Sequence, residues 1–186
     1  MVIRSQKRIV FFDIDTQYDF MDPAGRLYVK GAASIAGNLR KITALADRRG
    51  IPVVSTCDWH AARDPEFASF PAHCVRNTPG ARKIPQTIAK RTEQTVLRKF
   101  TTDVFSNPAV GRAVGRYTDV YVYGVALDYC VKTACLGARR LGLRVYMVKD
   151  AVRAISPKTG RAVMALLRRR GVRFITMKGL KRRILV

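Results

Sequence analysis

Cys130 has the sequence setting of a nucleophile. It stands in the first turn of a helix predicted over residues 129–141. The positive end of a helix dipole and the free N–H groups of a first turn favour a thiolate. An ammonium group such as Lys99 would lower the pKa of the thiol further, and a carboxylate such as Asp15 could carry its proton. Taken alone, a buried cysteine is more often an inert thiol, so both interpretations stay open.

Asp58, His60 and His73 form a second reactive group. Asp-x-His on an irregular segment lets two side chains turn toward one point, and His73, the only other histidine, follows in the same stretch. Two imidazoles and one carboxylate suit zinc, iron or manganese and leave positions for water or substrate. Surface histidines without function are an equally weighted alternative. Cys74 is geometrically awkward as a further ligand because it adjoins His73.

Alternating sequence patterns predict the elements that must position these residues. Short β-branched or aromatic runs predict strands, and apolar residues at helical spacing, closed by glycines, predict helices. Their alternation indicates an α/β fold with three layers, α/β/α, around a parallel sheet of six strands. The predicted strands are residues 9–12, 51–56, 94–98, 120–123, 144–148 and 172–176, and the predicted helices are 32–49, 129–141 and 157–170.

The candidate residues follow the carboxyl ends of predicted strands. Asp15 comes after the first strand, Asp58 after the second, Lys99 at the end of the third and Cys130 just past the fourth. These ends meet at one edge of a parallel sheet, so we expect the side chains to project into one crevice. Asp128 is expected to cap the helix that carries Cys130.

The domain organisation is simple. Residues 57–93 are irregular and rich in proline, and a stretch of that length inside a compact domain is usually functional. It contains the candidate metal ligands. The sequence shows no internal repeat or linker, so we expect a single domain over residues 1–186 with a metal-binding insertion at 57–93.

The composition is that of a globular protein with an unusual charge. Of 186 residues, 48% are hydrophobic, and no apolar run is long enough to span a membrane. The first residues lack the apolar segment of a secretory signal, so we expect a cytoplasmic protein with reduced cysteines. Thirty-five Lys and Arg against thirteen Asp and Glu give a net charge of +22. Without a nucleic-acid-binding motif, this charge predicts only weak, non-specific polyanion binding.

Five segments of the chain, taken together and in order, form a specific pattern. They are Phe12–Met21 (FDIDTQYDFM), Cys57–His60 (CDWH), Phe70–Val75 (FPAHCV), Lys99 with Asp103–Phe105 (DVF), and Gly124–Val131 (GVALDYCV). In this pattern the chain resembles the isochorismatase-like cysteine hydrolases and, within them, the nicotinamidases. The resemblance implies a Rossmann-like fold with a mainly parallel six-stranded sheet.

This resemblance implies catalytic roles for Asp15, Lys99 and Cys130 as a triad. The residues Thr-Gln-Tyr-Asp-Phe that follow Asp15 set the register, so Asp13 lies two positions too early and is expected to be structural. The resemblance further implies a cis peptide between Val125 and Ala126. The backbone N–H groups of Ala126 and Cys130 would then form an oxyanion hole.

The resemblance also implies a metal and a substrate pocket. Asp58, His60 and His73 match the metal ligands of nicotinamidases, which favours that subfamily because isochorismatases lack this set. One divalent transition metal is expected, zinc first, with iron and manganese admissible. Many nicotinamidases have Trp at the position of Phe70, and Phe retains the ability to stack on a ring. The implied substrate-binding residues are Phe20, Leu27, Phe70, Val125, Ala126 and Tyr129.

The function that the resemblance implies is hydrolysis of nicotinamide, a step of NAD salvage. A Cys130 thioester would form with release of ammonia and then be hydrolysed to nicotinate. Two alternatives are a metal-free relative acting on another small amide or an enol ether, and a basic nucleic-acid-binding protein on the same scaffold. A small-molecule amide is the expected partner, no membrane is expected, and a homo-oligomer stays open.

Overall fold

The structure, a computed structural model, describes residues 8–185 and contains a six-stranded sheet. Each pair of neighbouring strands is parallel, in the order β3-β2-β1-β4-β5-β6. The predicted α/β class and the six-stranded, mainly parallel sheet are therefore confirmed. The strands are β1 (Ile9–Ile14), β2 (Val53–Asp58), β3 (Gln94–Lys99), β4 (Asp119–Val125), β5 (Arg144–Arg153) and β6 (Arg173–Ile175).

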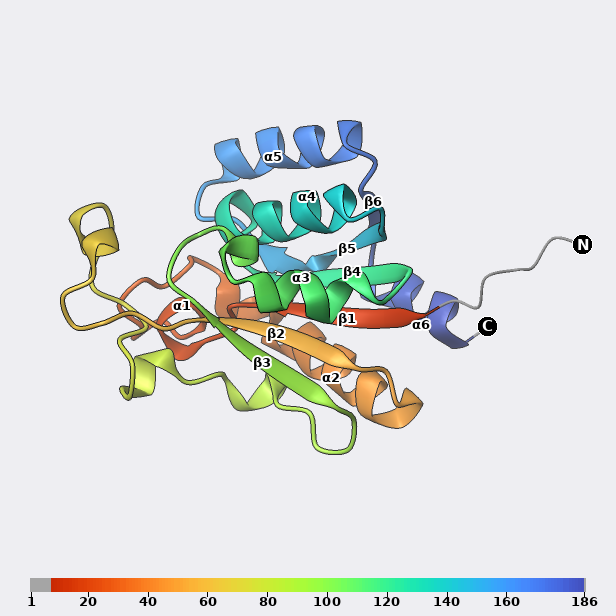
Figure 1. The fold of residues 1–186 in the computed structure, drawn as a ribbon, viewed down its shortest axis with the longest axis horizontal. Helices are drawn as coiled ribbons and strands as arrows, with labels where there is room; N and C mark the ends of the chain where they lie inside the picture. Colours follow the sequence, from red (N-terminus) through yellow and green to blue (C-terminus); the bar gives the residue numbers. More distant parts are fainter. Residues whose placement is uncertain (1–7, 186) are drawn as a thin grey trace, which may run out of the picture.

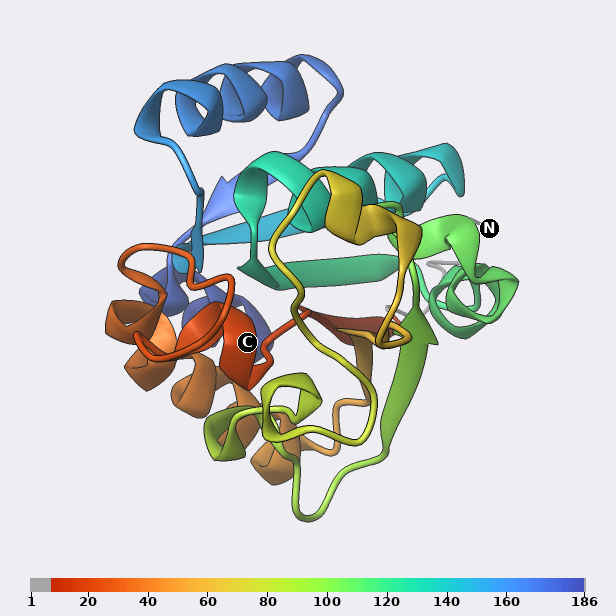
Figure 2. The ribbon, with the colours of Figure 1, turned by 90° about the vertical axis from the view of Figure 1, so that its left-hand side faces the viewer.

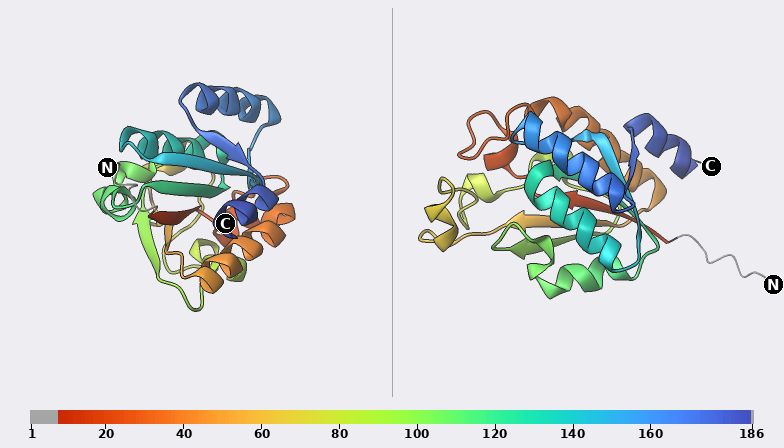
Figure 3. Two further views of the ribbon diagram at one scale, coloured as in Figure 1. Left: turned by 90° about the vertical axis from the view of Figure 1, so that its right-hand side faces the viewer. Right: turned by 90° about the horizontal axis from the view of Figure 1, so that it is seen from above.

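Helices cover both faces of the sheet and complete the three layers (Figures 1 and 3). Neighbouring residues of a strand point to opposite faces, so Phe11 packs in one hydrophobic core and Phe12 in the other. The helices α1 (Tyr18–Met21), α2 (Ala36–Arg49) and α6 (Met177–Leu185) line the core around Phe11. The helices α3 (Pro108–Gly115), α4 (Lys132–Arg140) and α5 (Pro157–Arg169) line the core around Phe12.

Element ends differ from the sequence expectation where the local pattern is weak. The helix predicted over 32–49 starts as a 3₁₀ turn, Ala32–Ile35, before α2, and Gly50 closes α2 in the left-handed conformation, as expected. The helix predicted over 129–141 starts as a π-helical turn, Leu127–Val131, that leads into α4. Strand β5 runs five residues past its predicted end because charged residues interrupt its apolar run.

Helices α1, α3 and α6 were not predicted, and α1 has only four residues. The α3 segment is short and contains Gly111 and Gly115, which lower helix propensity. Its start is stabilised by Asn107, whose side chain accepts a hydrogen bond from Ala109 N, and by Pro108 at the first position. Helix α6 follows β6 after a single residue, without a sequence break that marks its beginning. Among residues 8–185, no helix is both long and apolar enough to cross a membrane.

The topology creates a crevice beside β1. The chain builds β2 and β3 on one side of β1 and then returns to place β4 on the other side. Ligands of open α/β sheets bind at such a switch point, beyond the carboxyl ends of the strands. Figure 2 looks onto this edge, where the loop after β1 (red), the segment 57–93 (yellow to light green) and the start of α4 (teal) come together. The predicted irregular segment 57–93 contains no helix longer than a 3₁₀ turn.

Candidate active site

A buried ammonium group, that of Lys99, lies at the centre of the crevice. Lys99 ends β3 and is only 1% exposed. Its Nζ forms ion pairs with Asp58 Oδ1 and with Asp15 Oδ2, the latter at 2.9 Å, and lies 3.5 Å from Cys130 Sγ. It also donates to the carbonyl of Thr101 at 3.1 Å. The structure thus brings together the three residues expected to form a catalytic triad, from the ends of three different strands.

Burial shifts the pKa of each member of this triad. Desolvation raises the pKa of Asp15, and Lys99 only partly opposes this effect. Burial alone would lower the pKa of Lys99, but the charges of Asp15 and Asp58 raise it well above its ordinary value. The Lys99 ammonium therefore lies beside the Asp15 carboxyl group, whose pKa is raised.

The thiol of Cys130 departs from the sequence expectation of a lowered pKa. Burial raises the pKa of Cys130 well above its ordinary value, and the nearby carboxylates of Asp15 and Asp58 add to this rise. Lys99 acts in the opposite direction without reversing the shift. Helix position is a weak effect compared with removal of a thiolate from water. Formation of the thiolate therefore depends on a base that accepts its proton.

Asp58, His60 and His73 form a compact buried group beside this cluster. Asp58 Oδ2 lies 3.8 Å from His60 Nε2 and 3.7 Å from His73 Nε2. All three offer ligand atoms within 4.8 Å of one another. His73 Nδ1 is 2.8 Å from the carbonyl of Pro71, which assigns the proton to that nitrogen and leaves Nε2 as a donor to a metal.

The donor set fits a divalent transition metal. His60 Nε2 is buried and has no hydrogen-bond partner among the described residues. Buried polar atoms are almost always paired in native structures, so an unpaired imidazole nitrogen that faces a carboxylate and a second imidazole is suited to a metal ligand. Cys74 is not part of this group. Its backbone N–H donates to Asp19, and its thiol faces the carbonyl of Gly80.

The carboxylate of Asp58 joins the two groups. One oxygen accepts from Lys99, and the other faces both histidines. Burial alone would raise the pKa of Asp58, but Lys99 and the two histidines together hold it well below its ordinary value. The Asp58 backbone is held by the Gln17 side chain, which accepts from its N–H at 2.7 Å and donates to its carbonyl at 2.8 Å. Asp58 is therefore a fixed anion between the candidate metal site and the triad.

Three functional neighbours were missed from the sequence. Asp64 Oδ2 lies 3.1 Å from His60 Nδ1, without the alignment of a hydrogen bond, and orients that ring electrostatically. Glu66 lines the same pocket as Asp58 and His73, and burial together with the Asp58 charge raises its pKa. Gln17 positions Asp58. Asp64 had one sequence signal, its spacing of four residues from His60. No periodic pattern indicated Glu66 or Gln17.

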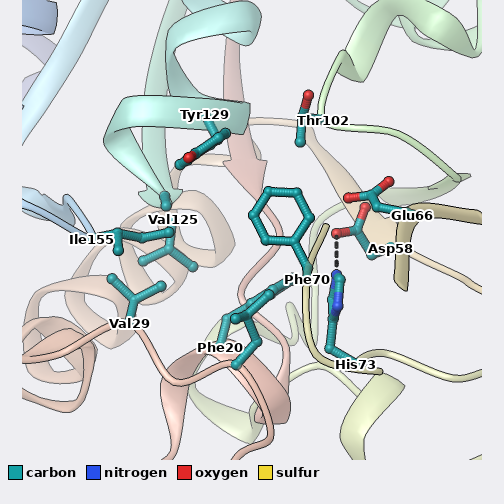
Figure 4. Close-up of a pocket in the computed structure, with 12 residues that line it drawn as sticks. Phe20, Val29, Asp58, Glu66, Phe70, His73, Thr102, Val125, Tyr129 and Ile155 are labelled. Atoms are coloured by element: carbon teal, nitrogen blue, oxygen red, sulfur yellow. Dashed lines mark ion pairs between the residues drawn. The ribbon is translucent and has the colours of Figure 1, made fainter. Parts of the chain in front are cut away.

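All six residues expected to bind substrate line one pocket, and Asp58 and His73 of the candidate metal site line it too (Figure 4). The pocket encloses about 380 Å³ of space, part of it open to solvent. The Phe20 ring lies 5.3 Å from that of His73, and the Phe70 ring lies 5.8 Å from that of Tyr129, centroid to centroid. A flat ring therefore has aromatic walls to contact. The residues that sequence reasoning missed here are Val29, Glu66, Thr102 and Ile155.

The nucleophile segment is held in an unusual backbone geometry. The peptide between Val125 and Ala126 is cis, as the resemblance implied. Gly124, with φ +112°, approaches the carbonyl of Ile14 so closely that a Cβ atom would collide with it. The expectation that Asp128 caps its own helix is wrong. Its carboxylate instead accepts from Ile155 N and Ser156 N at the entry to α5, because the π-helical turn directs it there.

The sequence profile of the isochorismatase domain family matches residues 10–179, a span that contains every site residue described above. The chain belongs to the isochorismatase domain family. Within this family, the nicotinamidase/pyrazinamidase of Mycobacterium tuberculosis is 29% identical over 180 residues, which cover 87% of this chain and 95% of that relative. The resemblance to isochorismatase-like hydrolases, and to the nicotinamidases among them, is thus confirmed.

Two solved structures of the isochorismatase fold agree with this placement. The pyrazinamidase of Pyrococcus horikoshii in complex with zinc superposes with a TM-score of 0.81 at 27% identity and covers 91% of this chain and 99% of its own. PnC1 from L. infantum in complex with nicotinate superposes with a TM-score of 0.82 at 27% identity, over 94% of this chain and 96% of its own. One relative therefore holds zinc and the other an aromatic carboxylate.

Proposed function

We propose that this protein is a metal-dependent cysteine amidase that converts nicotinamide to nicotinate and ammonia through a thioester on Cys130. The observation that carries the proposal is the position of the Lys99 ammonium. It contacts Asp15 and Asp58 and lies 3.5 Å from Cys130 Sγ, while the other oxygen of Asp58 faces the two histidines. The proposed metal-ligand set contributes Asp58 and His73 to the aromatic-walled pocket, and Asp58 connects that pocket to the proposed nucleophile and base through Lys99.

The enzyme class has independent support. The chain is a hydrolase that acts on an amide carbon–nitrogen bond, as its family and its nicotinamidase relatives indicate. The zinc complex and the nicotinate complex of its structural relatives support the metal and the product assigned here.

In the first half of the reaction, the Cys130 thiol transfers its proton to Asp15. The raised pKa of Asp15 makes it an effective base, and Lys99 stabilises the thiolate that forms. The sulfur attacks the amide carbon, and the backbone N–H groups of Ala126 and Cys130 hold the oxygen that becomes negative. Asp15 then delivers its proton to the departing nitrogen, which leaves as ammonia.

In the second half, Asp15 is again a carboxylate and can accept a proton from water. The resulting hydroxide attacks the thioester carbon, and the C–S bond breaks as the sulfur regains the proton from Asp15. The carboxylic acid formed loses its own proton to solvent and leaves as nicotinate. One water is consumed, and Asp15, Lys99 and Cys130 return to their starting states. Asp15 Oδ1 is fixed throughout by the hydroxyl of Thr56 at 2.7 Å, which leaves Oδ2 to carry the proton.

Asp58, His60 and His73 would hold the metal, with zinc first and iron or manganese admissible. When bound, such a metal supplies a Lewis acid that binds a ring nitrogen and withdraws electrons from the amide-bearing ring. Phe20 and Phe70 would cover the faces of that ring. Substrate orientation therefore depends on a ring nitrogen as well as on the amide.

A comparison of amides tests this proposal. We expect nicotinamide and pyrazinamide to be hydrolysed with similar kcat/KM values, because both present a ring nitrogen at the corresponding position. Benzamide, which lacks that nitrogen, should be much poorer, and isochorismate should not react. Ammonia release from the amides and pyruvate release from isochorismate are measured on one preparation with its metal content. Equal rates for benzamide and nicotinamide would contradict the metal's role, and a preference for isochorismate would contradict the amidase assignment.

A metal-free amidase on the same scaffold is the second candidate. The observation that favours it is the ion pair between Asp58 and Lys99, which gives Asp58 a partner without any metal. Full activity after exhaustive chelation, with metal content below a few per cent, would select this candidate.

A further inference from the structure

The positive charge of this protein is concentrated in its last third. Residues 129–186 contain sixteen Lys and Arg and a single acid, Asp150. Asp150 is engaged at the start of α6, where its carboxylate accepts from Met177 N. This segment therefore carries most of the net charge of +22 although it is less than a third of the chain. The proposed amidase reaction uses only Tyr129 and Cys130 from it.

The fold gathers these charges at the edge opposite the active site. Helices α4 and α5 end at residues 140 and 169, and the strands that follow them begin at 144 and 173, so both helices end at the amino ends of the strands. Helix α6 also ends there, because Arg183 donates to the hydroxyl groups of Tyr121 and Tyr146. We call this region the amino-end basic surface. It comprises Arg139, Arg140, Arg168, Arg169, Arg170, Arg173, Arg182 and Arg183.

Contacts link these arginines across neighbouring elements. The left view of Figure 3 looks onto this end of the sheet, with α4 and α5 on one face and α6 on the other. Arg139 Nε donates to the carbonyl of Arg170 at 3.2 Å, which joins the ends of α4 and α5. Arg173 and Arg183 donate to the same oxygen, Tyr146 Oη, which joins β6 to α6. A groove between α4 and α5 is lined by Leu136, Arg139, Arg140, Leu166 and Arg170.

Stabilisation of the helix ends explains only some of the arginines in the amino-end basic surface. A cation in the last turn interacts favourably with the helix dipole, and Arg139, Arg173 and Arg183 have structural hydrogen bonds. Four others, Arg140, Arg169, Arg170 and Arg182, are exposed, and their side chains form no hydrogen bond or ion pair with the described residues. They repel one another without compensation inside the chain, which favours an external polyanion.

The composition of the surface favours double-stranded nucleic acid. Arginine binds phosphate in a bidentate manner, and a duplex carries about one charge per 1.7 Å of axis. The nearby aromatic rings of Tyr146 and Phe174 lie under arginines and are not free to stack on bases, as single-strand binding requires. The apolar side of α5 is buried against the sheet, and the exposed leucines, Leu141 and Leu185, do not form a continuous apolar face for a bilayer.

We propose that the amino-end basic surface binds the phosphate backbone of double-stranded nucleic acid, without base recognition, and leaves the active site at the opposite edge free. The affinity must fall steeply with salt, because each neutralised phosphate releases bound counterions. Binding and hydrolysis are then independent properties of one chain.

The test is a matched pair of variants that each lose four positive charges. R140Q/R169Q/R170Q/R182Q removes the four unpaired arginines, and R26Q/K30Q/R63Q/R76Q removes four exposed cations from the loops that follow β1 and β2. Binding of a labelled mixed-sequence DNA duplex is measured by anisotropy between 50 and 200 mM salt. We expect the first variant to bind about tenfold more weakly or worse, with a salt slope reduced by about 0.9 for each lost phosphate contact, and the second to resemble the wild type.

Hydrogen exchange of the wild-type complex gives a second measurement that needs no variant. The duplex should protect amides near residues 139–142 and 168–173 and not those of segment 57–93. The proposal is overturned by an equal loss of binding in both variants, by no loss in either, or by protection of segment 57–93. It is also overturned if vesicles of phosphatidylserine and phosphatidylcholine bind at 150 mM salt more tightly than the duplex does.

Discussion

The carboxyl ends and the amino ends of the parallel strands, here the carboxyl edge and the amino edge, differ in how completely their buried charged groups are paired. At the carboxyl edge, Asp15 Oδ2 and His60 Nε2 are buried without a hydrogen-bond partner among the described residues, although Asp15 forms an ion pair with Lys99. At the amino edge, Asp119 accepts from Arg144 through two nitrogens, at 2.9 and 2.5 Å, and from Thr118. The first edge leaves buried polar atoms incompletely satisfied, whereas the buried carboxylate of Asp119 at the second edge is fully paired.

This difference separates reactive groups from structural ones. Buried polar atoms that lack partners reduce stability, so they persist where a ligand or a reaction uses them. Both edges contain ionisable residues, so composition alone does not mark the active site. The paired edge contributes to folding, and its unpaired arginines lie outside, in water. Variants at the two edges should therefore differ in kind: activity should change at one edge and stability at the other.

The largest expected effect is that of Cys130→Ala. It should lower turnover of nicotinamide by about a thousandfold or more, because removal of the nucleophile abolishes the covalent route. Metal content and thermal unfolding should stay close to those of the wild type. Cys135→Ala, a change at another buried thiol of the same helix, is the matched control and should retain most activity. Turnover by Cys130→Ala at more than a few per cent would contradict the thioester mechanism.

Loss of the metal is the next effect in size. His60→Ala and His73→Ala should each lose the bound metal after dialysis, and Asp64→Asn should weaken metal binding roughly tenfold or more through the orientation of His60. Metal content by mass spectrometry is the measurement. Cys74→Ser should keep its metal, because that thiol faces Gly80. Stoichiometric metal in both histidine variants would show that the three residues are not the ligands.

Lys99→Met should change the pH dependence of the reactivity of the Cys130 thiol. Lys99 is the group that lowers the Cys130 pKa, so its loss should move iodoacetamide alkylation of Cys130 to higher pH. Lys83→Met is the control, because Lys83 also forms an ion pair with a buried carboxylate, Asp13 at 2.5 Å, but does not contact Cys130. Lys83→Met should leave the pH profile of Cys130 alkylation unchanged. Superimposable profiles for Lys99→Met and the wild type would exclude Lys99 from thiolate stabilisation.

The smallest effect is expected at the amino edge. Burial alone would raise the pKa of Asp119, but hydrogen bonds from Arg144 and Thr118 lower it below 3.8. Its contribution to stability is therefore complete above its unfolded-state pKa near 3.8 and is lost as pH falls through the lower folded-state value. Asp119→Asn should cost about 1 kcal/mol at neutral pH, since the Arg144 side chain is half-exposed and screened.

Chemical denaturation of Asp119→Asn and the wild type at pH 7 and at pH 3 measures this effect. The difference in unfolding free energy should shrink at the lower pH, and kcat/KM at pH 7 should be unchanged. A loss of activity without a loss of stability would contradict the separation of the two edges.

The sequence alone determined the alternation of strands and helices and the order of the candidate residues along it. Strand ends could be located because apolar runs such as Ile9–Phe12 stop abruptly at acids, and the parallel sheet then required Asp15, Asp58, Lys99 and Cys130 to share an edge. The short α3 was missed because its glycines weaken the helical pattern. These outcomes depend on local propensity and on spacing, which a sequence displays directly.

Only the tertiary structure decided the electrostatics of the site. The Cys130 pKa is raised rather than lowered because burial and two carboxylates outweigh Lys99. The roles of Asp64 and Gln17, and the attachment of Asp128 to the entry of α5, depend on how irregular loops return to the crevice. Such contacts join residues far apart in sequence and follow no period. Desolvation, which sets the pKa values, is a property of the complete packed chain.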